Sequence, residues 1–125
     1  MTDPALRGFA SDNCSGAHPA MLEAIARVNG GHVGSYGADP ETARFRELVK
    51  AEFGESATGF PMLNGTGANV AALRAMARPH QAVICASTAH IHIDETAAPE
   101  AIAGLKLLTV DTADGKLTPE LIARF

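Results

Sequence analysis

The sequence predicts an α/β protein. Segments with helical periodicity alternate along the chain with short apolar runs of strand length, and turns rich in glycine, proline or asparagine separate them. This alternation is typical of a protein in which helices pack against a sheet of parallel strands. The segments on both sides of the glycine-rich stretch 30–37 are amphipathic and need a shared core, so we interpret that stretch as a functional loop within one domain.

Two helices are predicted in the first half of the chain. One begins at Pro19, carries apolar residues at spacings of three and four, and stops at the Asn29-Gly30-Gly31 run. The other has Asp39 as its N-cap and Pro40 in its first turn, runs to about Phe53 and stops at Gly54. We expect Phe45, Leu48 and Val49 to face inward from this second helix.

The second half predicts a strand over 60–63, a glycine turn, and a helix through Ala77. The runs Ala82 to Ala86 and Leu105 to Val110 predict two further strands, the first of them buried. Thr118-Pro119-Glu120 then has the composition of a helix start, but the sequence ends at Phe125 with no stop signal. We therefore expect the chain to be a truncated piece of a longer polypeptide.

Composition excludes several classes of function. The net charge is −4, and the 10 Lys and Arg residues are spread along the chain rather than clustered, which argues against a nucleic-acid partner. No apolar run approaches the roughly 20 residues that cross a bilayer, and no signal-peptide pattern follows Met1, so we predict a cytoplasmic protein without a membrane partner. Cys14 and Cys85 form no disulfide framework and are expected to be small buried residues.

The sharpest local signal is N-G-T-G-A-N at positions 64–69. A strand that ends in glycines and enters a helix directs backbone N–H groups and the positive end of the helix dipole at a ligand, and a phosphate suits that position. Gly65 and Gly67 would let an anion approach the backbone, and Thr66 would add a hydroxyl donor. The pattern lacks the lysine of a nucleoside-triphosphate loop. The alternative is a glycine turn that only connects a strand to a helix.

The segment T-A-H-I-H-I-D-E at positions 88–95 follows the predicted strand 82–86. If it stays extended, His90, His92 and Asp94 project to one face, where two imidazoles and a carboxylate could bind a divalent metal. A second interpretation has one histidine facing a ligand at the carboxyl end of a parallel strand. A third leaves the histidines satisfied by local hydrogen bonds in a loop.

Two loops carry further candidates. The Ser11-Asp12-Asn13 cluster before the first helix has the composition of a turn or capping segment. Tyr36 is the one tyrosine of the chain, and its glycine neighbours favour a loop that presents the phenol to a ligand or a neighbouring subunit. The alternative is a plain packed aromatic residue.

Taken together and in order, these segments resemble the amino-terminal part of the low-specificity L-threonine aldolases. This family consists of pyridoxal-phosphate enzymes with the aspartate-aminotransferase-like fold. The resemblance spans nearly the whole chain, and five motifs in register make it specific. Its motifs are S-D-N at 11–13, Y-G-A-D-P at 36–40, N-G-T-G-A-N at 64–69, A-H followed by D-E at 89–95, and K-L-L with G-K-L-T-P between 106 and 119.

The resemblance implies the three-layer α/β/α architecture of fold type I. Residues 1–125 would then form the N-terminal segment and part of the cofactor-binding large domain, with the rest of that domain and a small C-terminal domain outside this chain. It also implies a homodimer or homotetramer. The implied reaction is the retro-aldol cleavage of L-threonine, L-allo-threonine and related β-hydroxy-α-amino acids to glycine and an aldehyde.

The resemblance also implies residue roles. The phosphate of pyridoxal 5′-phosphate would lie at Gly65, Thr66 and Gly67, and His90 would stack on the pyridine ring and could serve as a catalytic base. Ser11 would help to hold the substrate carboxylate, and Tyr36 would lie close to the active site. It supplies no role for His92 or Glu95, and Cys14 stands where many members of the family have tyrosine.

The lysine that binds the cofactor covalently has no counterpart here, since Lys50, Lys106 and Lys116 stand in no matching motif. We therefore expect this chain to be inactive without the remainder of the enzyme. Three alternatives stay open from the sequence: another pyridoxal-phosphate lyase, such as a phenylserine aldolase or a tryptophanase-like enzyme; a metal-binding module; and a non-catalytic phosphate-binding fragment.

Overall fold

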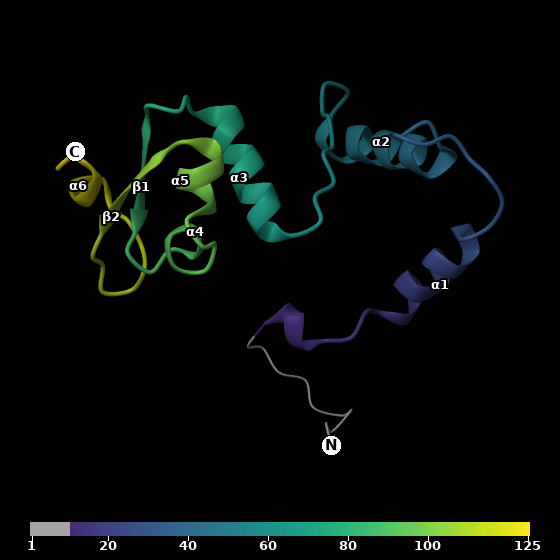
Figure 1. Cartoon of the computed structure of the whole chain (residues 1–125), viewed down its shortest axis with the longest axis horizontal. Helices are drawn as coiled ribbons and strands as arrows, with labels where there is room; N and C mark the ends of the chain where they lie inside the picture. Colours follow the sequence, from purple (N-terminus) through teal and green to yellow (C-terminus); the bar gives the residue numbers. More distant parts are fainter. Residues whose placement is uncertain (1–10) are drawn as a thin grey trace, which may run out of the picture. The chain divides into compact units, whose positions relative to one another are not determined.

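The computed structural model describes residues 11–125, which form two compact units. The first unit ends at Gly59, and the second spans Phe60–Phe125. Both described strands belong to the second unit, as the green and yellow-green arrows of Figure 1 show. The N-terminal residues 1–10 lie outside the described part of the chain.

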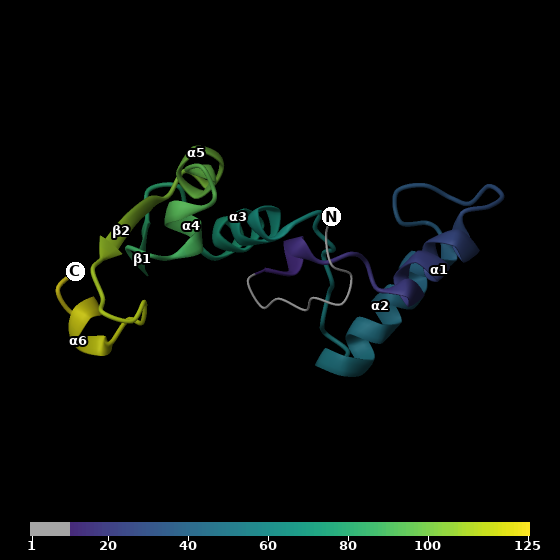
Figure 2. The same ribbon diagram turned by 90° about the horizontal axis from the view of Figure 1, so that it is seen from below.

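The first unit consists of short helices joined by loops (Figure 2). A 3-10 turn covers Asp12–Cys14, α1 spans Pro19–Val28 and α2 spans Pro40–Phe53. Helix α2 starts and stops where the sequence predicts, since Asp39 caps it and the backbone turns out of the helix at Gly54, with φ of 101°. Helix α1 is likewise confirmed.

The inward face of α2 differs in part from the expectation. Phe45 and Val49 are half-buried, and Gly59 lies so close to both that a Cβ there would meet the Phe45 ring at 2.6 Å and Val49 at 3.0 Å. Leu48 is 59% exposed, so its predicted inward position is wrong. Residues 45 and 49 project only about 40° apart on a helix, and the segment that returns after α2 crosses the helix on their side.

The second unit contains a two-stranded parallel sheet and the helices around it. Strand pairing runs in register from Ala82 opposite Lys106 to Ala86 opposite Val110, which confirms both predicted strands. The elements are α3 (Gly65–Met76), β1 (Ala82–Ala86), α4 (His90–Ile93), α5 (Ala98–Ala103), β2 (Lys106–Val110) and α6 (Pro119–Ile122).

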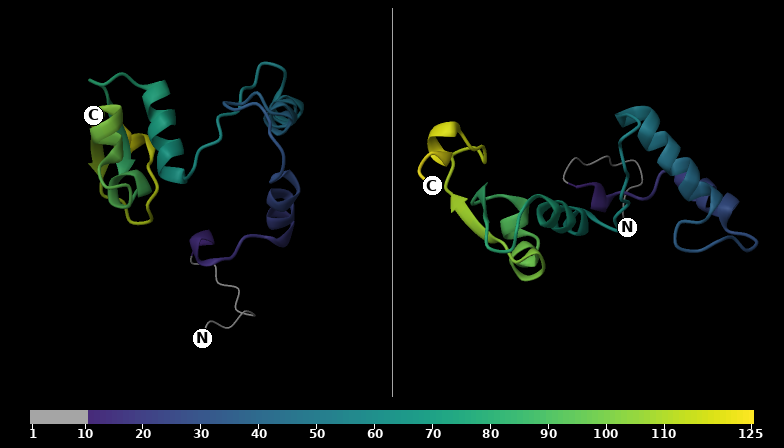
Figure 3. Two further views of the ribbon diagram at one scale, coloured as in Figure 1. Left: turned by 45° about the vertical axis from the view of Figure 1, so that its right-hand side comes forward. Right: turned by 90° about the horizontal axis from the view of Figure 1, so that it is seen from above.

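The core of this unit forms where α3, α5 and the start of β2 meet. Val70, Ala103 and Leu105 are buried there, and partly buried apolar residues of α3 and β1 pack around them. Helix α5 contacts both α3 and β2, and it lies beside α3 in Figures 2 and 3. Burying these side chains on one another removes apolar area from water and fixes α3 against the sheet.

The predicted strand over residues 60–63 is wrong, because this segment is irregular in the structure. Pro61 has no N–H to donate to a sheet ladder, and a strand of four residues gains its stability only from pairing with a neighbour. Phe60 and Leu63 are exposed. The segment therefore enters α3 as a loop.

Both strands of the sheet point toward the end of the unit at which α3 begins (Figure 1). Helix α4 follows β1 at that same end. Open α/β sheets bind their ligands outside the carboxyl ends of the strands, so this end of the unit is where a site is expected.

Two further expectations concern the cysteines and membrane spans. Cys85 is buried as expected, whereas Cys14 is exposed, because it ends a short turn whose neighbouring residues are themselves exposed. Within residues 11–125, no helix has the length and apolar content needed to cross a bilayer.

Leu105→Ala tests the core of the second unit. Leu105 is 3% exposed, so we expect the truncation to destabilise the unit by about 2–5 kcal/mol through lost burial and a residual cavity. Hydrogen exchange of the β1 and β2 amides measures the effect. Ile102→Ala, at a residue that is 71% exposed, is the matched control and should change protection little. Equal effects of the two variants would contradict this account of the core.

Candidate functional site

Helix α3 begins with an asparagine cap. Asn64 is extended, with φ of −151°, and its side-chain Oδ1 accepts a hydrogen bond of 2.8 Å from the amide of Gly67. Its carbonyl oxygen accepts a second bond, of 3.1 Å, from the amide of Ala68. The cap therefore fixes the first turn of the helix and leaves the two amides before Gly67 to be satisfied by something else.

Those two amides belong to Gly65 and Thr66. Within the described residues, neither donates to a protein acceptor, and a Cβ placed on Gly65 would meet no atom within 4 Å. The Thr66 side chain is half-buried beside them. Free N–H groups, an adjacent hydroxyl and the positive end of a helix of 12 residues form a favourable place for an anion.

Gly67 has a different part in this turn. Its amide is already taken by the Asn64 side chain, and a Cβ on Gly67 would lie 3.2 Å from that Oδ1 atom. Glycine at this position therefore lets the cap close tightly. A direct contact between Gly67 and a ligand stays a prediction.

The segment after β1 is helical where the metal hypothesis needs it extended. Residues 90–93 form α4, so His90 and His92 project about 200° apart and the two histidines cannot share one face with Asp94. The structure contains no group of three potential metal ligands among the described residues. The shared face of two histidines and an aspartate is thus wrong, because the chain enters a helix after only three residues beyond the strand.

A buried carboxylate holds His90. Glu95 is 1% exposed, and its Oε1 atom lies 2.8 Å from Nδ1 of His90 and 2.6 Å from Nδ2 of Asn69 on α3. Its second oxygen, Oε2, is buried and has no hydrogen-bond partner among the described residues. The His90 side chain itself is 64% exposed. One carboxylate therefore ties α3 to α4, while the imidazole remains accessible.

The backbone around Glu95 explains how this carboxylate reaches the interior. Thr96 and Ala97 both adopt left-handed conformations, with φ of 49° and 58°. The Glu95 carbonyl oxygen accepts a bond of 2.8 Å from Ala98 at the start of α5. Two consecutive residues other than glycine in this region cost conformational energy, so the packed segment must hold them there.

More polar groups lie around the carboxyl ends of the strands. A Cβ on Gly115 would lie 3.3 Å from the Thr88 hydroxyl, so the turn after β2 closes against the residues that follow β1. The Thr112 hydroxyl and Oε2 of Glu100 are buried and lack partners within the described chain. Burial, and secondarily the charge of Glu100, raises the pKa of the Cys85 thiol, which keeps that thiol protonated.

Tyr36 lies in the glycine loop of the first unit. Its side chain is fully exposed, which agrees with a loop that presents the phenol, and its φ of 57° is left-handed. The neighbouring Gly37 carbonyl oxygen accepts a bond of 3.2 Å from Nη1 of Arg46, which anchors the loop to α2. The role of Tyr36 toward a substrate stays a prediction.

Ser11 and its neighbours form the local turn that their composition predicts. The Ser11 hydroxyl oxygen accepts from the amide of Asn13 at 3.2 Å, and its carbonyl oxygen accepts from the amide of Cys14 at 3.2 Å. Contact of Ser11 with a substrate carboxylate stays a prediction.

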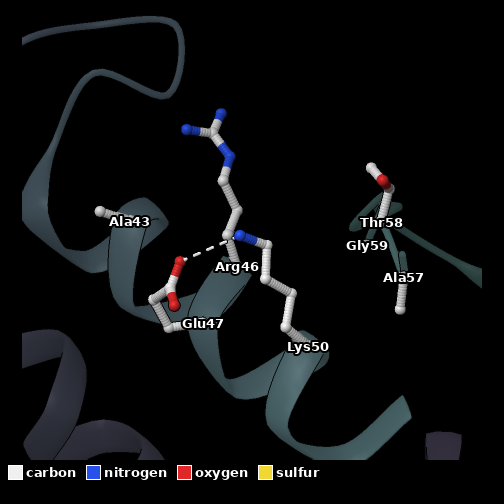
Figure 4. A pocket seen from close by; sticks show the side chains of 7 residues that line it. All are labelled: Ala43, Arg46, Glu47, Lys50, Ala57, Thr58 and Gly59. Carbon is white, nitrogen blue, oxygen red and sulfur yellow. Dashed lines mark hydrogen bonds and ion pairs between the residues drawn. The ribbon is translucent and has the colours of Figure 1, made fainter. Parts of the chain in front are cut away.

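A shallow pocket of the first unit lies beside α2 (Figure 4). Arg46 and Lys50 extend from the helix toward it, and Glu47 pairs with Lys50 at 3.4 Å. The opposite wall is formed by residues 57–59. This exposed ion pair contributes little stability.

Three of the residues that build the site were missed from the sequence. An asparagine directly before a predicted helix is an N-cap signal, so Asn64 could have been found. Asn69 is unfavourable inside a helix, and Glu95 is the second of two adjacent acids, directly before a run of small residues. Those features mark both as unusual, but 26 positions separate them, and only the fold shows that they meet.

An anion-binding helix start and a histidine at the carboxyl edge of a parallel sheet are typical of α/β proteins that bind phosphate-bearing ligands. Comparison with known proteins makes this class specific. The model of the beta-eliminating lyase family matches residues 8–125, and the chain therefore belongs to this family.

Individual relatives agree with the family. The chain is 44% identical to the low specificity L-threonine aldolase of Pseudomonas aeruginosa and 42% identical to that of a Pseudomonas species, over 98% of its own length in each comparison. It spans about a third of those relatives, 35% of each. A Leishmania major threonine aldolase structure matches 88% of the chain and is itself covered to 32%, with a TM-score of 0.76 and 34% identity. The α/β fold of fold type I is thereby confirmed.

The stability of α2 should depend on pH through its N-cap, Asp39. Its Oδ2 accepts a bond of 2.6 Å from the Thr42 hydroxyl and its Oδ1 one of 2.8 Å from the Thr42 amide, and these bonds hold the pKa of Asp39 below 3.8. A depressed carboxyl pKa in the folded state means that the cap stabilises α2 above the unfolded value and loses this effect as the pH falls through the folded value.

We expect Thr42→Ala to raise the pKa of Asp39 toward 3.8, because the hydroxyl is the largest cause of the shift and the amide bond remains. The carboxyl carbon shift of Asp39 in a pH titration by NMR measures this. Glu120 is the internal control, since its lowered pKa arises from its own backbone and from Thr118 at another helix. An unchanged Asp39 titration would contradict the assignment.

Proposed function

We propose that this chain is the cofactor-binding part of a pyridoxal-phosphate-dependent aldehyde-lyase. The complete enzyme would cleave L-threonine, L-allo-threonine and related β-hydroxy-α-amino acids into glycine and an aldehyde. The observation that carries this proposal is the 44% identity over nearly the whole chain to a low specificity L-threonine aldolase. The free amides at the start of α3 support it independently, because they supply the donors that a phosphate ester needs.

The experiments use what we call the extended protein. This is the present chain continued to the length of its relatives, either by its own natural continuation or by the corresponding residues of the Pseudomonas aeruginosa enzyme. The extension matters because this chain has no lysine in a motif that matches the family's cofactor-binding lysine.

The residues of the second unit fit the phosphate end of pyridoxal 5′-phosphate. Gly65 offers an amide with open space where a side chain would otherwise stand, and Thr66 offers an amide and a hydroxyl. Gly67 keeps the Asn64 cap closed behind them. These donors would hold the dianionic phosphate ester, and the dipole of α3 would favour its charge.

His90 has two roles in this proposal. Its accessible ring would lie against the pyridine ring and fix its plane, and its outer nitrogen, Nε2, would accept the proton of the substrate β-hydroxyl group. When bound, pyridoxal phosphate supplies an electron sink for the electron pair left at Cα as the Cα–Cβ bond breaks. The aldehyde leaves as that hydroxyl oxygen becomes a carbonyl oxygen.

Ser11 and Tyr36 would complete substrate binding. A serine hydroxyl can donate to the substrate carboxylate, and the exposed phenol of Tyr36 is free to donate to a ligand or to a neighbouring subunit. The resemblance favours a homodimer or homotetramer, and we propose that the enzyme is cytoplasmic. Both remain parts of the proposal.

The family also leaves a second lyase activity open. The matching family is named for beta-elimination, so a phenylserine aldolase or a tryptophanase-like lyase would fit the same cofactor site. A substrate panel on the extended protein separates these alternatives. Glycine and acetaldehyde from L-threonine or L-allo-threonine support the aldolase, whereas turnover confined to phenylserine or tryptophan would replace it.

Thr66→Ala tests the phosphate site. Loss of one hydroxyl donor to a charged ester should weaken binding of pyridoxal phosphate to the extended protein by about 10- to 100-fold. Equilibrium dialysis with absorbance detection of the cofactor measures this. Thr66→Ser keeps a hydroxyl at the same place and should bind nearly as well as the parent. If Thr66→Ala binds the cofactor unchanged, the phosphate lies elsewhere.

His90→Ala tests the histidine. The variant of the extended protein should release the cofactor more readily and lose about 10²- to 10⁴-fold in kcat, since it removes both the stacked ring and the proton acceptor. His92→Ala is the matched control, because His92 is an exposed histidine two positions along the same short helix. Activity that survives His90→Ala, or falls equally in both variants, would remove His90 from the reaction.

A further inference from the structure

We propose that Glu95 is a positioning residue, which fixes the orientation and the tautomer of His90 by accepting the proton-bearing Nδ1 at its buried Oε1 atom. Neither the family resemblance nor the spacing of the motifs gives this residue a role. The consequence for catalysis rests on the function proposed above, whereas the orientation of His90 does not.

The hydrogen-bond inventory of the cluster fixes the direction of these bonds. The Asn69 side-chain nitrogen can only donate, so Oε1 of Glu95 accepts at 2.6 Å. His90 Nδ1 approaches the same oxygen at 2.8 Å. An ionised carboxylate that receives both donors makes two charge-assisted bonds. His90 therefore carries its proton on Nδ1 in the neutral form.

Burial makes this arrangement hard to replace. A carboxylate that is 1% exposed has almost no contact with water, so removal of either donor leaves a buried charge with one hydrogen bond in place of two. Oε2 has no partner among the described residues, which leaves Oε1 to make all of the bonds in the described part of the chain. Asn69 and His90 thus both help to hold the Glu95 side chain in this place.

The geometry also determines what His90 presents outward. Nδ1 is held against Glu95, and the side chain as a whole is 64% exposed, so the far nitrogen, Nε2, lies on the accessible side. With the proton on Nδ1, Nε2 has a free lone pair. A ring fixed in this way can accept a proton at Nε2. The other tautomer would present an N–H donor at Nε2 and could accept no proton there.

Asn69 connects this histidine to the anion site. It stands on α3 one turn after Gly65 and Thr66, so the helix that offers the free amides also supplies the donor that steadies Glu95. The plane of the imidazole is thereby set relative to the helix start. A cofactor held at its phosphate by α3 would meet a histidine positioned by the same helix.

The test measures the tautomer of His90 directly. Ring ¹⁵N shifts of the extended protein, with and without pyridoxal phosphate, report which nitrogen carries the proton. The parent should show Nδ1–H in both states. Glu95→Gln removes the charge at nearly constant shape, and we expect a mixture of tautomers with a substantial Nε2–H population. In the loaded enzyme, kcat should fall about 10- to 100-fold while KM changes much less.

Matched variants separate positioning from a merely structural role. Glu100→Gln neutralises another partly buried carboxylate of the same unit that makes no bond to His90, and it should leave the tautomer and kcat unchanged. Glu95→Asp retains the charge and should restore part of the Nδ1–H population. If Glu95→Gln does not fold, Glu95→Asp serves as the test, since its shorter side chain withdraws the carboxylate from Nδ1 and should still give less Nδ1–H than the parent.

The outcomes are distinct. An unchanged ring tautomer in Glu95→Gln, or in Glu95→Asp where Glu95→Gln does not fold, overturns the proposal, as does an equal loss in Glu100→Gln. A tautomer change in a protein that binds no cofactor and cleaves no threonine would uphold the role of Glu95 and reject the proposed function. A tautomer change without loss of kcat would confine Glu95 to orienting the ring and overturn its part in catalysis.

Discussion

The buried carboxylate of Glu95 is the interaction on which the geometry of the candidate site depends. It accepts hydrogen bonds from α3 and from α4 at one oxygen, and it has almost no contact with solvent. Because an unpaired charge in the interior is costly, this carboxylate keeps both donors close and so holds two helices in fixed relation. Two strained backbone positions after it are the conformational cost of directing an acid inward.

The rest of the second unit supports that arrangement. Parallel pairing of β1 with β2 brings the carboxyl ends of both strands to the end where α3 begins, and the apolar core around Leu105 holds α3 and α5 against the sheet. The Asn64 cap then uses one amide of the first turn and leaves two for a ligand. Two free amides and a histidine held by a carboxylate therefore arise from one small set of contacts.

Much of the fold is predictable from local sequence. The helices that begin at Pro19 and Pro40 carry clear start and stop residues, and the apolar runs 82–86 and 105–110 identify the strands. The turn into α3 follows from the glycines of the run 64–67. The strand predicted over 60–63 is wrong because a strand needs a neighbour to pair with. The predicted metal-binding face of two histidines and an aspartate is wrong because residues 90–93 form a helix. The contact of Asn69 with Glu95 depends on the fold, and the spacing of these residues in the sequence does not predict it.

In the proposed enzyme, the first turn of α3 binds the phosphate of the cofactor and His90 lies over its ring. A crystal structure of the extended protein with pyridoxal phosphate tests both placements. We expect phosphate oxygens at hydrogen-bond distance, about 3 Å, from the amides of Gly65 and Thr66, with the His90 ring stacked on the pyridine ring. A cofactor whose phosphate is bound by another element, or whose ring is remote from His90, would contradict the account.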